Sequence, residues 1–307
     1  MEELLDRSEL QRPLRRALRR FGQEQWDPAL LHNPLFSDLL VQEVHAEPNL
    51  LPRLRAELYA ALAGPGPGGI QALGWMVKNG LARADVVLSF VSRLPIGMPD
   101  EGALREPETL EVAEALLTLE DLRRPLKVAV AIQLLSSSLL SPRGRSALLQ
   151  RLLSATWMHA SDRRSVLVWA LGGELPEEVC AAFSQLPGPP GELIRPALTG
   201  LVAQGEDPTA VIRLGLERMG AWDDPIPGLM GLMDVLEGAG TAVQAALRRQ
   251  LLDLAVRHEL SSIRRRAYAI GEKLEGESFM RLAVRDADSS IRAWAVSRIR
   301  PRVGTGG

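Results

Sequence analysis

The chain has 307 residues, of which 46% are hydrophobic and only 4% are aromatic. This length and apolar content suffice for a sizeable core and exclude an intrinsically disordered chain. Leu, Ala and Arg dominate, and unbranched side chains of this kind favour helix over strand. The composition therefore predicts an all-α fold.

The net charge of −2 is distributed unevenly along the chain. From Thr241 onward there are 13 Arg and Lys against 7 Asp and Glu, a net charge of +6. Residues 1–20 carry +2, which leaves −10 for the middle of the chain. The sequence thus predicts a basic C-terminal segment on an acidic body, which bears on partners rather than on fold.

Three features of the sequence bear on location. No run approaches the roughly 18 apolar residues of a membrane-spanning helix, so we expect no membrane partner. The opening residues, "MEELLDRSELQRPLRR", lack the apolar core of a signal peptide. Cys180 is the only cysteine, which excludes an intramolecular disulfide and favours a cytoplasmic location.

The predicted helices fall into three regions. Residues 1–63 form an N-terminal helical unit, with helices near 3–21, 28–45 and 49–63. Residues 64–107 form a connector, in which "GPGPGG" at Gly64–Gly69 predicts a non-helical joint and helices follow near 70–78 and 83–93. Residues 108–307 hold the remaining helices, near 108–119, 124–140, 143–157, 162–172, 176–186, 191–204, 208–219, 227–237, 241–258, 261–274, 277–285 and 289–299. These regions could equally form one continuous array.

Some residues predict local structure. Asp27 before Pro28, and Asp207 before Pro208, suit a helix N-cap followed by Pro at the first helical position. Asp223 and Asp224 before Pro225 suit a capped turn. Cys180 lies among small apolar residues and is predicted to be a core residue.

Two segments near the C-terminus repeat at an offset of 28 residues. "LAVRHELSSIRRRAYAI" starts at Leu254 and "LAVRDADSSIRAWAVSRI" starts at Leu282. The paired serines predict caps for the second helix of each copy. Ile263, Ala267, Ile270 and Leu274 follow at helical spacing and predict one buried face. Each copy is therefore a helical hairpin that needs neighbours.

These hairpins resemble the HEAT-like repeats. The motif is an acid, a polar turn, an aliphatic–Arg pair and then Ala, as in "DADSSIRAWAVSRI". Looser forms are "SDRRSVLVWALG", "LRRPLKVAVAIQLL" and "ELIRPALTGL". The resemblance implies a right-handed α-solenoid whose second helices line the concave surface. It also implies a ladder between repeats, with Asp286 or Asp288 pairing with Arg292, and with Arg264 in the same role.

Motifs for chemistry are missing from the sequence. There is no phosphate-binding G-x-x-x-x-G-K-[ST], no G-x-S-x-G and no H-E-x-x-H. The four histidines have no metal-ligand spacing. We therefore expect a protein that is not an enzyme and has no cofactor, no metal and no catalytic residue.

Two other resemblances give alternatives. Trp222 beside Asp223 and Asp224 is similar to the aromatic and acidic residues of HEAT-like alkylpurine DNA glycosylases, which implies nucleic-acid binding through the basic C-terminal face. The HEAT-like bilin lyases are a third family, although no residue here marks a tetrapyrrole site. Binding of a nucleic acid would require many neutralised phosphates, which the acidic body disfavours.

The candidate binding residues are basic or aromatic and lie mostly outside the repeat motif. They are expected to bind a protein partner with an acidic surface, so that the chain acts as a scaffold or adaptor. The set is Arg248, Arg249, Arg265, Arg266, Tyr268, Trp294 and Arg298.

Overall fold

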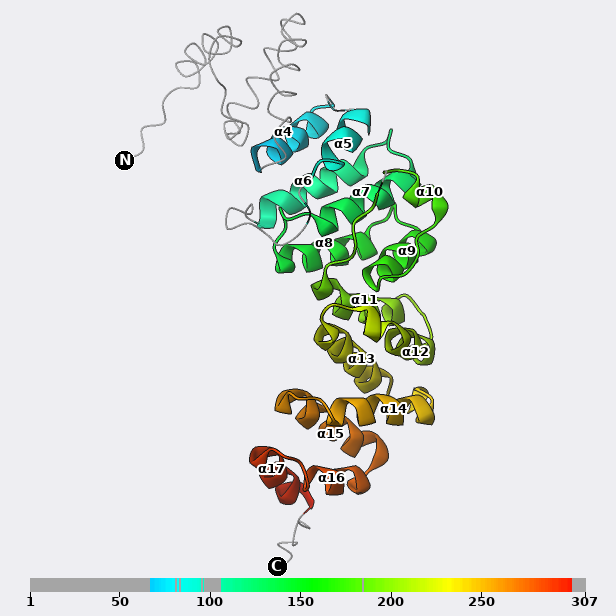
Figure 1. Ribbon diagram of the computed structural model, residues 1–307. Helices are drawn as coiled ribbons and strands as arrows, with labels where there is room; N and C mark the ends of the chain where they lie inside the picture. Colours follow the sequence, from blue (N-terminus) through cyan, green and yellow to red (C-terminus); the bar gives the residue numbers. More distant parts are fainter. Residues whose placement is uncertain are drawn as a thin grey trace, which may run out of the picture. The chain divides into compact units, whose positions relative to one another are not determined.

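The computed structural model describes residues 67–80, 82, 84–94, 96, 106–183 and 185–299 (Figure 1). Within these residues the fold is all-α, as predicted, and the one strand-like contact is an isolated antiparallel bridge between Ile96 and Ser137. The predicted helices within 1–63 lie outside the described residues. The described helices form two compact units, of which the first is Met1–Asp162 with Leu175–Gly188 and the second is Arg163–Glu174 with Pro189–Gly307.

The α-helices of the first unit lie close to the predicted positions, except that α10 is much shorter than predicted. They are α4 (Pro67–Lys78), α5 (Ala84–Val91), α6 (Glu106–Thr118), α7 (Arg124–Ser136), α8 (Pro142–Ser154), the start of α9 (Ala160–Ala170) and α10 (Glu177–Cys180). Helix α7 packs against α5, α6, α8 and α10. Every residue of α7 from Lys127 to Ser136 is buried, as expected for a helix that is apolar on nearly all sides.

Three predictions for this unit were wrong. Pro67, Gly68 and Gly69 begin α4 instead of forming a joint, because Pro is well suited to the first turn of a helix. The helix predicted near 176–186 ends at Cys180. Cys180 is exposed, and the neighbouring Val179 supplies the buried side chain instead.

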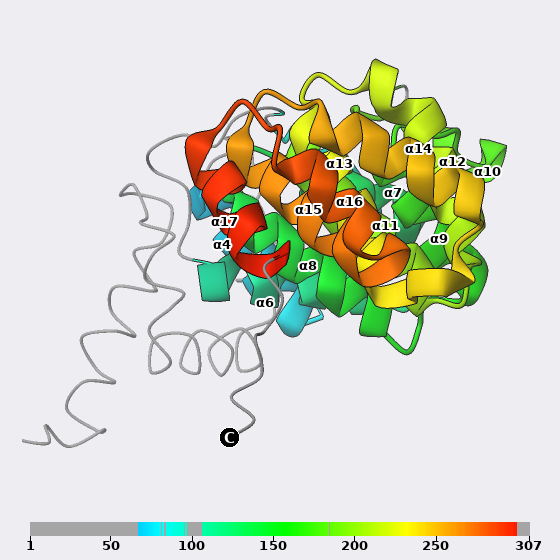
Figure 2. The same cartoon turned by 90° about the horizontal axis from the view of Figure 1, so that it is seen from below.

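The second unit holds the rest of α9 and the helices that follow Pro189. The helices are η2 (Gly191–Leu193), α11 (Ile194–Ala203), α12 (Pro208–Arg218), η3 (Met219–Ala221), α13 (Pro225–Ala239), η4 (Gly240–Ala242), α14 (Ala245–Val256), α15 (Ser261–Glu275), α16 (Glu277–Ala283) and α17 (Ser289–Ile299). Successive helices pack on one another, and Figure 1 shows α12 to α17 following one another in chain order. Figure 2 views the same helices from below, where they overlap.

Local sequence explains where several of these helices begin and how they pack. Asp207 caps α12 by accepting a hydrogen bond from Thr209 N, which confirms its predicted cap, while Asp27 lies outside the described residues. Asp224, predicted in a capped turn, accepts a hydrogen bond from Ile226 N and caps α13. On α15, Ile263, Ala267 and Ile270 are at most 2% exposed, so the predicted buried face is confirmed for these three residues. Because this apolar face of α15 packs into the interior, the residues on the other side of the helix are the ones left at the surface.

Candidate functional site

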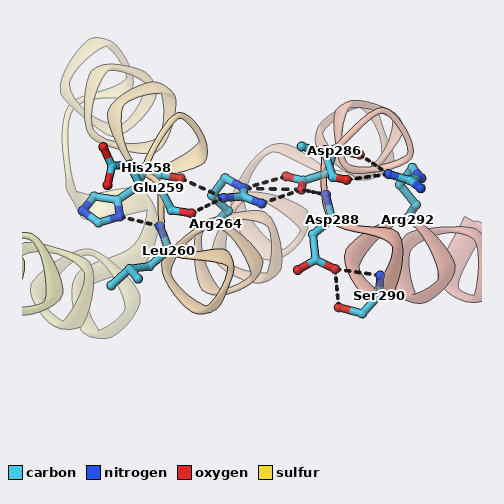
Figure 3. Close-up of polar contacts among 9 residues, drawn as sticks. His258, Glu259, Leu260, Arg264, Asp286, Asp288, Ser290 and Arg292 are labelled. Atoms are coloured by element: carbon cyan, nitrogen blue, oxygen red, sulfur yellow. Dashed lines mark hydrogen bonds and ion pairs between the residues drawn. The ribbon is translucent and has the colours of Figure 1, made fainter.

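Arg264 joins the two copies of the repeat. Its Nη1 donates to the carbonyl oxygens of His258 (2.9 Å) and Glu259 (2.7 Å) at the end of its own hairpin turn (Figure 3). Its Nε and Nη2 donate to the carboxylate of Asp286 in the next turn, at 3.0 and 2.9 Å. The side chains are 13% and 2% exposed, which confirms the predicted ladder role of Arg264.

Asp286 is held as a carboxylate by several donors. Hydrogen bonding from Arg264 lowers the pKa of Asp286, with further contributions from the backbone of Asp288 and the hydroxyl of Tyr268. Burial, and then the hydrogen bond to Asp286, raises the pKa of Tyr268 to about 12. Tyr268 also packs its ring against Phe279 and is only 5% exposed. Tyr268 is thus part of the interior and not of a binding surface.

Arg292 repeats one half of this arrangement. Its Nη1 donates to the carbonyl oxygens of Asp286 and Ala287, both at 2.8 Å, as Arg264 does in the copy before it (Figure 3). The predicted side-chain pair of Arg292 with Asp286 or Asp288 does not form, because Asp286 faces Arg264 and Asp288 caps α17. Arg292 therefore fixes the turn of its own hairpin.

The predicted serine caps were also wrong. Leu260 precedes α15 without a side-chain cap, and Ser261 is the first residue of that helix. At α17 the cap is Asp288, whose Oδ1 accepts hydrogen bonds from Ser290 N (2.8 Å) and Ser290 Oγ (2.7 Å). These bonds from Ser290 lower the pKa of Asp288. An aspartate one residue earlier reaches the free N–H groups better than the serine pair does.

A groove of ≈ 540 Å³ lies between α15 and α17. Four of the predicted binding residues line it: Arg265, Arg266, Trp294 and Arg298. The other lining residues are Ser261, Ser262, Ala269, Ser290 and Ile291. The structure therefore brings four of the seven candidates together. They come from α15 and α17, which are the equivalent helices of the two copies of the 28-residue repeat.

Trp294 contacts two of the arginines that line this groove. The guanidinium carbons of Arg265 and Arg298 lie 5.5 and 5.4 Å from the centroid of its ring, within cation–π range. Arg298 also donates from Nη1 to Glu272 Oε2 at 2.6 Å. Arg265 is exposed, and within the described part of the chain it forms no ion pair with a carboxylate.

A row of ion pairs crosses the same side of the second unit. It links Arg195 of α11 to Asp234 of α13 (2.6 Å), and Asp234 to Arg266 of α15 (2.5 Å). It continues from Glu237 to Lys273 (2.7 Å), and hydrogen bonds from Lys273 and then Arg266 lower the pKa of Glu237. With Glu272–Arg298, the row joins α11, α13, α15 and α17 on one side. None of these carboxylates was predicted to belong to a site, although the spacing of Asp234 and Glu237 along α13 at i and i+3 is typical of one helix face.

The other predicted residues lie outside the groove. Arg248 is 13% exposed on its side chain, donates to Glu275 at 3.1 Å and donates to Val243 O at 2.8 Å. Arg249 is 72% exposed and lies 3.8 Å from Glu275. The contacts of Arg248 hold α14 to the end of α15, whereas Arg249 remains at the surface.

The first unit holds a smaller groove of ≈ 350 Å³, which has Leu117, Leu148, Leu152 and Trp157 among its lining residues. Beside it, the Lys127 ammonium lies 5.5 Å from the centroid of the Trp157 ring, and burial lowers the pKa of Lys127. None of the predicted binding residues lies here.

The remaining observations concern chemistry that the described residues do not support. Among the residues that the structure describes, no group of three or more His, Cys, Asp or Glu is placed to hold a metal ion. Trp222 donates from Nε1 to Leu171 O at 3.2 Å, and its neighbour Asp224 caps α13, so both residues have structural contacts. No described helix is long and apolar enough to cross a membrane.

No known family model, curated protein or solved structure matches this chain.

Proposed function

We propose that this protein is a HEAT-like α-solenoid that acts as a non-enzymatic scaffold or adaptor. It would bind an acidic surface of a protein partner through the side on which α11, α13, α15 and α17 meet. The observation that supports this proposal most directly is the groove between α15 and α17, where Arg265, Arg266, Trp294 and Arg298 gather. Tryptophan and arginine are the side chains most enriched at the energetic centres of protein interfaces.

The repeat geometry supports the solenoid part of the proposal. Arg264 bridges one hairpin to the next through Asp286, and Arg292 repeats its carbonyl contacts 28 residues later. Such nearest-neighbour contacts are typical of repeat proteins, whose stacked units build extended binding surfaces. We further propose that the solenoid is right-handed, as the resemblance to the HEAT-like repeats implies. We also propose a cytoplasmic location, which the single cysteine favours.

Photo-crosslinking in a native extract tests the proposal. A photoreactive phenylalanine at Ser262 stands in the groove, whereas the same residue at Ser278 on α16 stands outside it as the matched control. We expect covalent protein adducts from position 262 and none from position 278. No adduct, or the same adducts from both positions, would contradict the scaffold proposal, and a nuclease-sensitive adduct would support nucleic-acid binding instead.

A further inference from the structure

Arg265 is the one cation of the groove that has no carboxylate partner among the described residues. Arg266 is neutralised by Asp234 and Glu237, at 2.5 and 3.1 Å, and Arg298 is paired with Glu272. Arg265 contacts the ring of Trp294 instead and is exposed to solvent. A cationic side chain in this setting is available to an anion from outside.

The contact with Trp294 prepares Arg265 for a carboxylate. A guanidinium that lies over an aromatic ring keeps the N–H groups at its edge free, and two of these match the two oxygens of a carboxylate. The same contact restricts the rotamers of a long side chain, which lowers the entropy lost on binding. The exposed Ser262 beside it adds a hydroxyl donor on the same wall of the groove.

The charges around the groove favour a single carboxylate over a series of phosphates. Among the acidic residues near the groove, Asp288 bonds to the groove residue Ser290, and Glu272 pairs with the groove residue Arg298. Binding of a phosphodiester chain depends on neutralising several phosphates at once. Because the other groove arginines already have carboxylate partners, the one unpaired arginine suits one monoanionic group.

We infer that an acidic peptide segment of the partner lies in this groove and places an Asp or Glu carboxylate on Arg265. Its aliphatic atoms would contact Trp294 and Ala269, and Ser262 would donate a further hydrogen bond. A volume of ≈ 540 Å³ is within the range of sites that hold several side chains. This inference rests on the proposed scaffold function, because a partner protein must supply the segment.

Fluorescence anisotropy on the full chain tests the inference. The probe is a fluorescein-labelled peptide of alternating Glu and Leu, and its analogue carries Gln in place of Glu. At low ionic strength we expect the Glu peptide to bind about tenfold more tightly than the Gln peptide, as one charge-assisted hydrogen-bonded pair allows. Arg265→Gln should abolish this difference.

The matched control is Arg281→Gln on α16. Arg281 is 75% exposed, and its one ion pair with another described residue is with Glu277 in its own helix turn, so its loss should leave the preference for the Glu peptide intact. Equal binding of both peptides to the unmodified protein, or equal effects of the two substitutions, would overturn the inference. Tighter binding of a phosphoserine peptide or of duplex DNA than of the Glu peptide would overturn it as well.

The crosslinking experiment separates this inference from the scaffold proposal. Adducts from position 262 that are unchanged by Arg265→Gln would leave the scaffold function standing and remove the carboxylate site. Binding of the Glu peptide without any protein adduct from position 262 would instead support the carboxylate site and contradict the scaffold function. Thermal unfolding of both arginine variants, followed by circular dichroism, establishes that the fold is unchanged.

Discussion

Arg264 and Arg265 are neighbours in the chain and yet differ in every contact. The side chain of Arg264 is 13% exposed, and its N–H groups donate hydrogen bonds to His258, Glu259 and Asp286. The guanidinium of Arg265 lies over the ring of Trp294, which leaves its N–H groups accessible to solvent or a ligand. Successive residues of a helix are about 100° apart around its axis, so one arginine is structural and the next is available for binding.

Replacing Asp286 by Asn should destabilise the protein strongly. The substitution leaves the largely buried Arg264 without its counter-charge, and we expect a loss of roughly 3 kcal/mol in the free energy of unfolding at neutral pH. Denaturant unfolding measures this loss. Asp253→Asn on α14, an exposed position, is the control and should change little.

The pH dependence of stability gives a second readout for Asp286. Its pKa is lower in the folded state than the ordinary value of 3.8, so its contribution is complete at neutral pH. The contribution is lost as the pH falls below about 4 and through the lower folded-state pKa. The Asn variant should therefore lose less stability than the unmodified protein over this acidic range. Parallel curves for the two proteins would contradict the assigned role of the pair.

At the scale of elements, α13 shows how closely the helices of the second unit approach. A Cβ atom on Gly231 would lie 2.9 Å from Leu198 Cδ1 and 3.0 Å from the Cα of Arg195 on α11. Leu198 could move aside, but the backbone of Arg195 cannot do so without shifting α11. Glycine at position 231 therefore sets the distance between α11 and α13.

Gly231→Ala should lower the stability by roughly 1–3 kcal/mol, the usual cost of overpacking. Gly238→Ala on the same helix is a matched control of opposite sign, since a Cβ there meets nothing within 4 Å. Alanine has the higher helix propensity and should stabilise the protein by up to about 1 kcal/mol at that position. Chemical denaturation measures both values, and two equal shifts would contradict the packing argument.

The helix positions could be predicted from the sequence because apolar periodicity and Asp-Pro pairs are local signals. The ladder role of Arg264 was expected only from the resemblance of its motif to the HEAT-like repeats. The burial of Arg248 and Tyr268 was harder to predict, because it depends on contacts with Glu275 and Phe279, which lie on other helices. Periodicity also does not distinguish a helix that continues from one that ends early, as α10 does at the exposed Cys180.

At the scale of the whole molecule, the second unit is built from two separate stretches of chain. Arg163–Glu174 belongs to it, although Leu175–Gly188 returns to the first unit. Within the second unit, Trp222 donates to Leu171 O (3.2 Å), Arg218 donates to Gly172 O (3.0 Å), and Arg164 pairs with Glu206 (2.7 Å). The early stretch is therefore part of the folded core of this unit.

A fragment that spans 189–307 should be less stable than one that spans 160–307. The shorter fragment lacks Leu167 and Leu171, both nearly fully buried, and leaves the indole N–H of Trp222 without its acceptor. We expect a lower thermal midpoint and a red-shifted tryptophan emission for the shorter fragment. Equal midpoints would show that the early stretch contributes little to the second unit.

The two sets of hydrogen bonds that Arg264 donates, within its own hairpin and to the next one, bear on the order of folding. Its bonds to His258 and Glu259 span only six and five residues, so they can form together with a single hairpin, while its bonds to Asp286 span 22 residues. The ion pairs along α11, α13, α15 and α17 likewise join residues no more than 39 apart. Contacts of such low contact order favour rapid folding that spreads from one hairpin to its neighbour.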